Sequence, residues 1–327
     1  MAALTPEQFG AVGDRKADDT AALQAMLAEP STTQRPRQYE LRGQYKVTAP
    51  LRLASAPACS FDLDGRGGSL WWAGGSEPCL QFGDSAAGSK VYWSTVTGLR
   101  ISTLGGTPGG VQVLLDDADF LTLDNVVISA AGRQVGLKSL RGNSLDFRSV
   151  HVSAAREVNA DIVANVFAWR AGKVQQAPVG LRYTGTQFDI RAIDFSFLTD
   201  CAVELSAAAC GSLSFYSEKI GPHTSMNSAA VIRATGSNSV TISGAILNGT
   251  WGAQSADTHC GYGVVLDNCH RFDFVATRFQ RLQRAAIKPT GCQEIVVRRS
   301  CEWRYPQPGA VRVDGDGVTW ESSSTCW

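Results

Sequence analysis

The sequence predicts an all-β fold: a solenoid of parallel strands with about 24 residues per coil and a helix over its N-terminal end. The main observation is a unit that recurs from about residue 96, with an apolar pair, a polar turn and a period-2 strand in succession. These second strands begin at Leu121, Leu145, Phe188, Leu213, Val240, Phe272 and Ile295. Their separations are 24, 43, 25, 27, 32 and 23 residues. Repeats of this length are typical of solenoids, whose stacked coils share one core.

A column of small residues supports this register. Three positions before the second strands stand Ala118, Gly142, Gly185, Cys210, Ser237, Cys269 and Cys292. A turn that is repeated coil upon coil has room only for small side chains, so we expect Cys210, Cys269 and Cys292 to lie inside the solenoid as stacked, reduced thiols. The chain has nine cysteines and no CxxC pair, which argues against a disulfide framework and against a structural zinc site.

The N-terminal segment has a different pattern. Asp18, Asp19 and Thr20 offer capping groups for a helix over about residues 19–28. The apolar side of that helix carries Leu23, Met26 and Leu27. A solenoid needs its open end covered, because exposed strand edges invite aggregation. We therefore expect a capping segment over residues 1–40 and a solenoid domain over residues 41–327.

Three connections between coils are longer than the others. They cover roughly residues 153–178, 221–230 and 248–263, and the first is compatible with a short helix. All leave the same turn of the coil, so we expect them to line one edge of the solenoid. Insertions on one side of a repeat array often form the binding face.

Composition excludes several classes of protein. Hydrophobic residues make up 44% of the chain and charged residues 18%, which fits neither a disordered nor a membrane-spanning protein. The 30 basic and 30 acidic residues cancel, so no electrostatic footprint for nucleic acid is evident. The first ten residues, MAALTPEQFG, lack the basic and apolar regions of a secretion signal.

Three short motifs resemble a known superfamily. FGAVGD at residues 9–14, DDTAALQ at 18–24 and GQYKV at 43–47 are similar to the opening of the pectate-lyase-like superfamily of right-handed parallel β-helices. Its members include polysaccharide lyases, glycoside hydrolases, uronan epimerases and bacteriophage tailspikes. The resemblance implies a right-handed parallel β-helix, but a fold alone does not determine an activity.

Within that superfamily the missing signal, the reduced cysteines and the early start of the motif favour the tailspike branch. The resemblance then implies a homotrimer on a virion tail, made in the host cytoplasm, that contacts other phage tail proteins and bacterial surface polysaccharide. Many tailspikes also carry particle-binding and trimerisation domains, and neither is evident here. Hydrolysis of the polysaccharide is the first expectation. A lyase acting on an acidic glycan and a non-enzymatic adhesin or structural spike remain the alternatives.

Outward positions of the second and third strands carry the candidate catalytic groups Asp189, Asp194, Glu218 and Asp146. Successive coils lie about 4.8 Å apart, so carboxylates one or two rungs apart suit the acid–base pair of a glycosidase. Asp146 and Asp189 are one rung apart only if residues 153–178 form a loop. A solvated ladder of aspartate and arginine pairs explains the same pattern and stays open.

The candidate substrate-binding residues surround these carboxylates. Arginine side chains bind the carboxylates of acidic sugars, and flat aromatic rings stack on sugar C–H faces. The candidates are Arg148, Arg191, Tyr216, His151, Trp169 and Trp251. A further aspartate cluster suits calcium but equally suits a polar turn: Asp116, Asp117 and Asp119. The four histidines share no metal-ligand spacing, and we expect neither a metal nor another cofactor.

Overall fold

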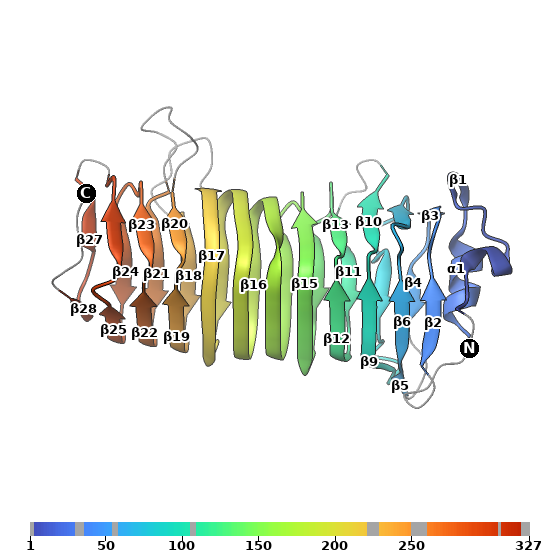
Figure 1. Ribbon diagram of the computed structural model, residues 1–327, viewed down its shortest axis with the longest axis horizontal. Coiled ribbons are helices and arrows are strands. Elements are labelled where there is room, and N and C mark those ends of the chain that lie inside the picture. Colours follow the sequence, from blue (N-terminus) through green and yellow to red (C-terminus); the bar gives the residue numbers. More distant parts are fainter. Residues whose placement is uncertain are drawn as a thin grey trace. The chain divides into compact units, whose positions relative to one another are not determined.

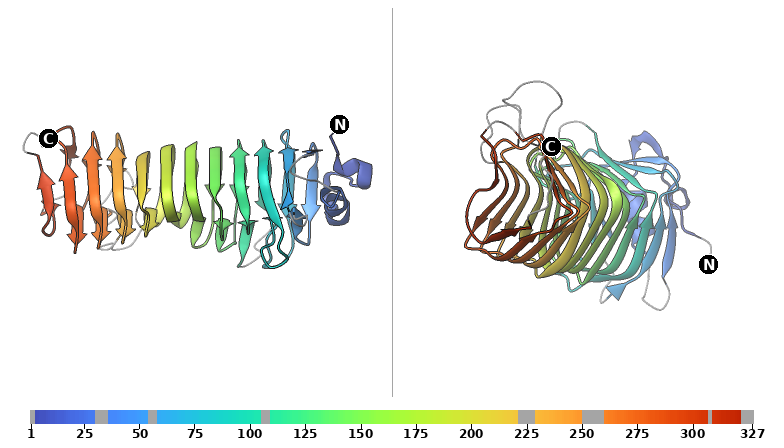
Figure 2. Two further views of the ribbon diagram at one scale, coloured as in Figure 1. Left: turned by 90° about the horizontal axis from the view of Figure 1, so that it is seen from below. Right: turned by 60° about the vertical axis from the view of Figure 1, so that its left-hand side comes forward.

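The computed structural model describes residues 3–29, 36–53, 58–104, 109–220, 229–249, 260–306 and 309–321, with the backbone alone for 218–220. The chain forms two compact units, Met1–Trp169 and Arg170–Trp327, here called unit 1 and unit 2. Each unit is a stack of short strands whose ladders are parallel, which confirms the predicted all-β solenoid (Figure 1). In Figure 2 the strands of successive coils within each unit lie over one another and form continuous sheets.

Unit 1 begins with a short 3-10 helix, one α-helix and the first coils. Its elements are η1 (Pro6–Phe9), β1 (Asp14–Asp18), α1 (Thr20–Leu27), β2 (Arg37–Glu40), β3 (Gln44–Val47), β4 (Leu51–Leu53), β5 (Ala58–Cys59), β6 (Phe61–Asp64), β7 (Ser69–Trp72), β8 (Leu80–Phe82), β9 (Lys90–Thr97), β10 (Arg100–Thr103), β11 (Val111–Leu115), β12 (Ala118–Asp124), β13 (Val127–Ser129), β14 (Val135–Ser139) and β15 (Ser144–Ser153). The strand β16 (Val158–Ser206) continues from unit 1 into unit 2.

The predicted N-terminal helix is confirmed as α1, and its acidic residues have specific partners. Asp18 Oδ1 accepts hydrogen bonds from the amide and the hydroxyl of Thr20 at 3.1 and 2.5 Å. The carboxylate of Asp19 instead accepts the amides of Val12 and Gly13, at 2.7 and 3.1 Å. One acidic residue therefore holds the start of the helix and the other holds the preceding turn. The buried side of α1 carries Leu23, Met26 and Leu27, as expected.

The ladders confirm the coil period. Leu121 is paired with Leu145, and Phe272 with Ile295, offsets of 24 and 23 residues. Side chains of these positions point inward and are no more than 1% exposed. The alternate residues of the same strands face solvent, as the period-2 pattern requires.

The expected insertion at residues 153–178 is wrong. In unit 1, β16 pairs with β14, with Val158 beside Val135 and Ile162 beside Ser139. Val158, Ala160 and Ile162 point into the core and are at most 2% exposed. The segment is therefore a further coil without a helix, and the 43-residue separation spans two coils. Asp146 and Asp189 consequently do not lie on successive coils, because this coil comes between them in the chain.

Unit 2 repeats the three-strand coil. Its strands after β16 are β17 (Cys210–Ile220), β18 (Ala230–Thr235), β19 (Asn238–Ser243), β20 (Ile246–Asn248), β21 (Tyr262–Asp267), β22 (His270–Val275), β23 (Arg278–Gln280), β24 (Ala285–Thr290), β25 (Gln293–Val297), β26 (Glu302–Arg304), β27 (Val311–Val313) and β28 (Val318–Trp320). Most of the other two expected insertions lies outside the described residues.

The cysteine column is confirmed only in part. Cys269 is 2% exposed, and its amide donates to the Sγ of Cys292 at 3.4 Å, so these two residues stack on adjacent coils. Cys292 is half-buried and Cys210 is exposed, which corrects the expectation that all three lie inside. All eight cysteines of the described residues are free thiols.

We expect thiol reactivity to follow this burial. Burial raises the pKa of Cys79 and of Cys260 to about 12, so both are almost entirely protonated near neutral pH and react slowly. Among the eight cysteines of the described residues, a thiol reagent added to the native protein should modify Cys210 fastest. Loss of the fast phase in Cys210→Ser checks this, and rapid modification of Cys260 in the native state would contradict it.

Candidate functional site

A continuous polar column runs along the outward face of the second strands of unit 2. Each member is the register partner of the next, so successive side chains lie about 4.8 Å apart. We call this set the polar column: Asp189, Ser212, Thr241, Asp273, Val296 and Thr319. Five of its six members carry a carboxylate or a hydroxyl group. The column thus offers hydrogen-bonding groups at a regular spacing along the stack.

Asp189 begins the column and is held as a carboxylate. Its Oδ1 accepts hydrogen bonds from Ser212 Oγ and Arg191 Nε, each at 2.6 Å, and Arg170 Nε lies 3.8 Å from its Oδ2. Burial alone would raise the pKa of Asp189, but these hydrogen bonds and the two guanidinium charges outweigh it and lower the pKa. Asp189 therefore stays ionised and is a poor proton donor.

Asp194 lies on the same strand beyond a bend. Ala192 adopts a left-handed backbone with φ 55°, which shifts the alternation so that Asp194 faces outward as Asp189 does. Lys173 Nζ lies 3.6 Å from Asp194 Oδ2, whereas the buried Oδ1 accepts no hydrogen bond from the described residues. Tyr216, 39% exposed, is its register partner on the next coil. Asp194 thus combines an ion pair with an acceptor oxygen that is unused.

The other end of the column opens into a surface cleft with a volume of about 520 Å³. Arg298 forms a two-pronged ion pair with Asp273 at 2.8 and 3.0 Å, and Arg271 donates to Glu294 at 2.9 Å. The bond from Arg271 is the main reason that the pKa of Glu294 is lowered, so this group is ionised as well. Uncharged Thr241 lies between Asp273 and Ser212, so it separates these ion pairs from the Asp189 end of the column. The cleft therefore presents fixed charges of both signs.

The sequence did not predict this cleft, because the outward residues of the 240–246 coil are uncharged. One of its two ion pairs comes from the position just before the second strand, where Arg271 and Glu294 have φ of 57° and 54°. A left-handed residue breaks the strict alternation of faces, so a period-2 reading leaves it out. A charged residue immediately before an apolar strand start was the available signal.

The predicted residues of unit 1 form a separate group. Arg148 donates to Asp146 Oδ2 through Nε and Nη2, at 2.9 and 2.6 Å. His151 is exposed and lies on the same strand, β15. This group matches the aspartate–arginine ladder that was left open as an explanation, and Asp189 with Arg191 repeats it in unit 2.

Three other expectations have different outcomes. Trp169 is fully buried and meets Phe147 edge-on at 5.7 Å, so its ring belongs to the core and offers no face to a sugar. Trp251 and the side chain of Glu218 lie outside the described residues.

The aspartate cluster of unit 1 forms a polar turn. Lys90 Nζ lies 2.9 Å from Asp119 and 3.4 Å from Asp117, while Asp116 accepts the hydroxyl of Ser85 at 2.9 Å. The described residues contain no group of three or more histidine, cysteine or acidic side chains placed to hold a metal ion. In the described part of the chain, no helix is long and apolar enough to cross a membrane.

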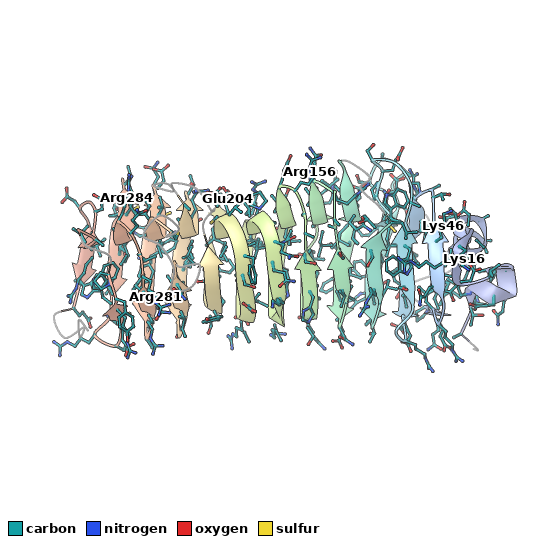
Figure 3. The ribbon with its side chains drawn as sticks, turned by 90° about the horizontal axis from the view of Figure 1, so that it is seen from above. Lys16, Lys46, Arg156, Glu204, Arg281 and Arg284 are labelled. Atoms are coloured by element: carbon teal, nitrogen blue, oxygen red, sulfur yellow. The ribbon has the colours of Figure 1, made fainter. Side chains whose placement is uncertain are left out.

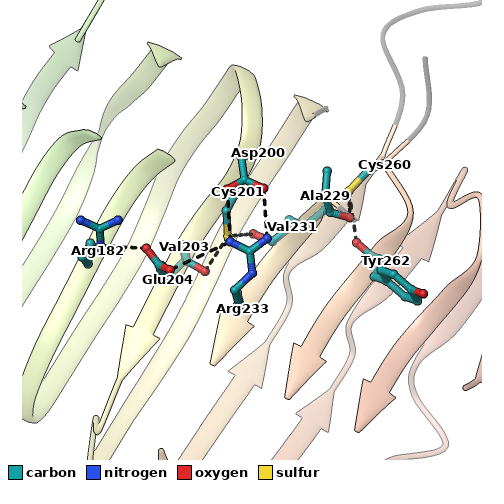
Figure 4. Close-up of polar contacts among 10 residues, drawn as sticks. All are labelled: Arg182, Asp200, Cys201, Val203, Glu204, Ala229, Val231, Arg233, Cys260 and Tyr262. Atoms are coloured by element: carbon teal, nitrogen blue, oxygen red, sulfur yellow. Dashed lines mark hydrogen bonds and ion pairs between the residues drawn. The ribbon is translucent and has the colours of Figure 1, made fainter. Parts of the chain in front are cut away.

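A second ionic network lies on the first strands of unit 2 (Figure 4). Arg233 pairs with both oxygens of Asp200 at 3.0 and 3.2 Å, and its Nη1 is 4.0 Å from Glu204. Glu204 in turn accepts Arg182 Nε at 2.8 Å. The hydrogen bonds that Arg233 donates to Asp200 are the main reason that the pKa of Arg233 is raised. The charges of this network satisfy one another, so we assign it to the stability of the stack.

Three charged side chains of unit 2, those of Glu204, Arg281 and Arg284, do not all point the same way. Figure 3 shows Glu204 and Arg284 projecting to one side of the ribbon and Arg281 to the other. Arg284 Nη1 donates to the hydroxyl of Tyr262 at 3.1 Å, and Lys288 lies 5.1 Å from the centre of the same ring. These cations are therefore bound to the coil surface beneath them.

Comparisons with known proteins identify the fold. No family model matches the sequence, and no curated protein matches it. Among solved structures, the Dettilon tailspike protein matches with a TM-score of 0.66 and 9% identity over 99% of this chain and 66% of its own. The A-module of an Azotobacter vinelandii mannuronan C-5 epimerase matches with a TM-score of 0.65 and 12% identity over 99% of both chains.

The tailspike protein of the E. coli bacteriophage HK620 matches with a TM-score of 0.61 and 10% identity, over 92% of this chain and 66% of its own. This chain thus spans 66% of the length of each of these two tailspikes. At such identities the likeness is one of fold, and it agrees with the resemblance to the pectate-lyase-like superfamily.

Proposed function

We propose that this protein binds bacterial surface polysaccharide along the polar column of unit 2, as a receptor-binding protein of the tailspike kind. The observation that carries the proposal is the continuous column that leads from Asp189 to the cleft beside Arg298. A polymer with repeating hydroxyl groups can make the same hydrogen bonds on successive rungs. The two tailspikes and the mannuronan epimerase among the similar structures support a glycan as the ligand.

Hydrolysis is the activity that we propose for the start of the column. The side chain of Asp194 is 39% exposed. Glu218 lies on the next coil opposite Ser196, two residues further along the strand than Asp194. A rung of about 4.8 Å and two residues of about 3.3 Å each place the two Cα atoms about 8 Å apart. A Cα separation of about 8 Å is compatible with the roughly 6.5–9.5 Å between carboxyl groups that an inverting glycosidase needs, with one acid and one base. Asp189, which Arg191 and Arg170 hold as a carboxylate, is not the general acid in this proposal and would orient the substrate.

Elimination is the second candidate, and the cations beside the carboxylates favour it. Arg170 and Arg191 lie at Asp189, and Lys173 lies at Asp194, where they can neutralise the carboxylate of an acidic sugar. Products with an unsaturated uronate absorb near the ultraviolet edge, whereas hydrolysis yields new reducing ends without this absorbance. Binding with neither product would leave an adhesin or a structural spike.

The assembly that we propose is a homotrimer on a virion tail, in contact with other tail proteins. Unit 1 exposes the apolar side chains of Leu140, Val163 and Val166, each 39–43% accessible, on neighbouring coils. Contact with a second copy would cover them. Light scattering at micromolar concentration tests this, and a stable monomer would contradict the trimer.

We expect Thr241→Tyr to weaken glycan binding strongly, because the larger ring occupies the path of the ligand between Ser212 and Asp273. The measurement is the binding of labelled protein to an array of purified capsular polysaccharides, O-antigens and alginate. Thr235→Tyr is the matched control, since Thr235 is exposed on the first strand β18 of the same unit. Equal binding by both variants would exclude the polar column as the site.

A further inference from the structure

Unit 1 carries one exposed and two half-buried aromatic rings near the start of two successive second strands. Trp93 is 60% exposed and lies parallel to Phe120, with ring centroids 4.0 Å apart and 6° between the planes. Tyr92 meets the two rings edge-on, with centroids 5.7 and 5.4 Å away. We call Tyr92, Trp93 and Phe120 the aromatic platform.

The backbone at these positions directs side chains away from the core. Trp93 and Phe120 are left-handed, with φ of 50° and 53°. The same conformation recurs at the same place in the coils of unit 2, at Ser239, Arg271 and Glu294. A fold that accepts these polar residues does not require an aromatic ring there. A left-handed residue with a bulky side chain also costs about 1–2 kcal/mol, so folding alone does not explain the platform.

Charged groups border the aromatic platform. Tyr92 is the register partner of Asp119, which forms an ion pair with Lys90 at 2.9 Å. The other oxygen of Asp119 accepts the amide of Asn143 at 2.7 Å. Lys90 is also 3.4 Å from Asp117. A flat apolar surface therefore lies beside fixed hydrogen-bond donors and acceptors.

The preceding coil holds this segment in place. Ser60 Oγ donates to the carbonyl of Trp93 at 2.8 Å, and the amide of Phe61 donates to Ser94 Oγ at 3.1 Å. Ser94 is 1% exposed, so the second bond is inside the coil. A platform that is already ordered loses little conformational entropy when a ligand binds.

We propose that the aromatic platform binds a hexopyranose ring, as a second sugar site separate from the polar column. The C–H face of the ring would stack on Trp93, while one of its hydroxyls would accept a hydrogen bond from Lys90, whose ammonium Asp117 and Asp119 hold in place. The area argues against a second copy of the chain as the occupant. A tryptophan offers about 150–250 Å², of which the exposed part is about 90–150 Å², whereas a stable protein interface needs about 800 Å² per partner.

The source of the sugar, a bacterial surface polysaccharide, rests on the proposed function. We expect Trp93→Asn to weaken binding to the array of capsular polysaccharides, O-antigens and alginate by about five- to tenfold. Trp93→Phe should keep most of the affinity. Asparagine tolerates the left-handed conformation, so the thermal midpoint of Trp93→Asn should equal or exceed that of the unmodified protein.

The matched control is Tyr305→Asn. Tyr305 is 58% exposed and left-handed with φ 49°, but Arg281 lies over its ring at 5.8 Å in place of a stacked aromatic ring. Unchanged affinity in Tyr305→Asn together with the loss in Trp93→Asn supports the sugar site. An equal loss in both variants overturns it.

Two further outcomes separate this site from the proposed function. Binding that Thr241→Tyr strongly weakens and Trp93→Asn leaves unchanged overturns the aromatic platform and keeps the polar column. Binding that only Trp93→Asn weakens keeps the platform and removes the column. A change of oligomeric state in Trp93→Asn, seen by light scattering, overturns the sugar site because the ring then lies between copies of the chain. Absence of binding to the whole array overturns both proposals.

Discussion

Arg133→Met should lower the free energy of unfolding of unit 1 by about 3–5 kcal/mol, because it leaves several buried carbonyl oxygens without a donor and each such group costs about 1–3 kcal/mol. Arg133 is 0% exposed, and its guanidinium donates to four backbone carbonyls. The acceptors are Gly75 and Ser76, at 2.6 and 3.1 Å, with Glu77 and Val111. Methionine fills a similar volume but leaves these oxygens without a donor. Denaturant unfolding followed by near-ultraviolet circular dichroism measures the change.

Two companion variants sharpen this test. Arg133→Lys should lose nearly as much, because one ammonium group cannot reach carbonyls that the planar guanidinium bridges. Arg156→Met is the control, since Arg156 is exposed and its backbone amide donates to the carbonyl of Arg133 at 2.7 Å. Its effect should stay within about 0.5 kcal/mol. A loss below 1 kcal/mol in Arg133→Met would show that water or neighbouring donors replace the guanidinium.

The fold could be predicted because each coil repeats a local pattern. Leu121, Leu145 and the later strand starts mark inward positions, and stacking them fixes the register of the whole ladder. The coil that contains Trp169 escaped prediction because its outward positions include apolar Val163 and Val166, which hide the alternation. Stacking on β14 nevertheless fixes that segment as a strand. Tertiary packing thus determined the conformation of this segment, for which the local pattern was ambiguous.

For the candidate site, the sequence predicted which side chains face outward but not which residues they contact. Alternation correctly indicated that Asp189 and Arg191 face outward on the second strand, because period 2 assigns each residue of a strand to one side. Asp194 faces outward as well because it belongs to the third strand, beyond the bend at Ala192. It could not supply the ion pairs from Arg170 and Lys173, since these depend on which coil precedes the strand. A sequence pattern fixes the direction of a side chain, whereas its partners come from the stacking of coils that are distant in the chain.

Asp194→Asn should reduce polysaccharide cleavage by at least ~100-fold, the scale of losing acid–base assistance, while binding to the glycan array stays nearly unchanged. Asparagine keeps the shape of the side chain and removes only the ionisable group. The assay measures new reducing ends and ultraviolet absorbance on each polysaccharide that the unmodified protein binds. Glu218→Gln should have an effect of similar size, because an inverting mechanism needs both carboxyl groups.

Asp189→Asn is the matched comparison on the same strand. Asp194 and Glu218 are the proposed acid and base, and the carboxylate of Asp189 is already bonded to Ser212 and Arg191, so the loss of rate should stay below about tenfold. Asp189→Asn should instead lower the free energy of unfolding at a pH above the pKa of an aspartate in the unfolded chain, because the ionised carboxylate holds Arg191 and Arg170. The difference in stability between the variant and the unmodified protein should vanish as the pH falls through the lowered pKa of folded Asp189. Full activity in both Asp194→Asn and Glu218→Gln would place the catalytic groups elsewhere than on these two strands, β16 and β17. A large loss in Asp189→Asn alone would make Asp189 the reacting group and reverse the assignment of the two aspartates.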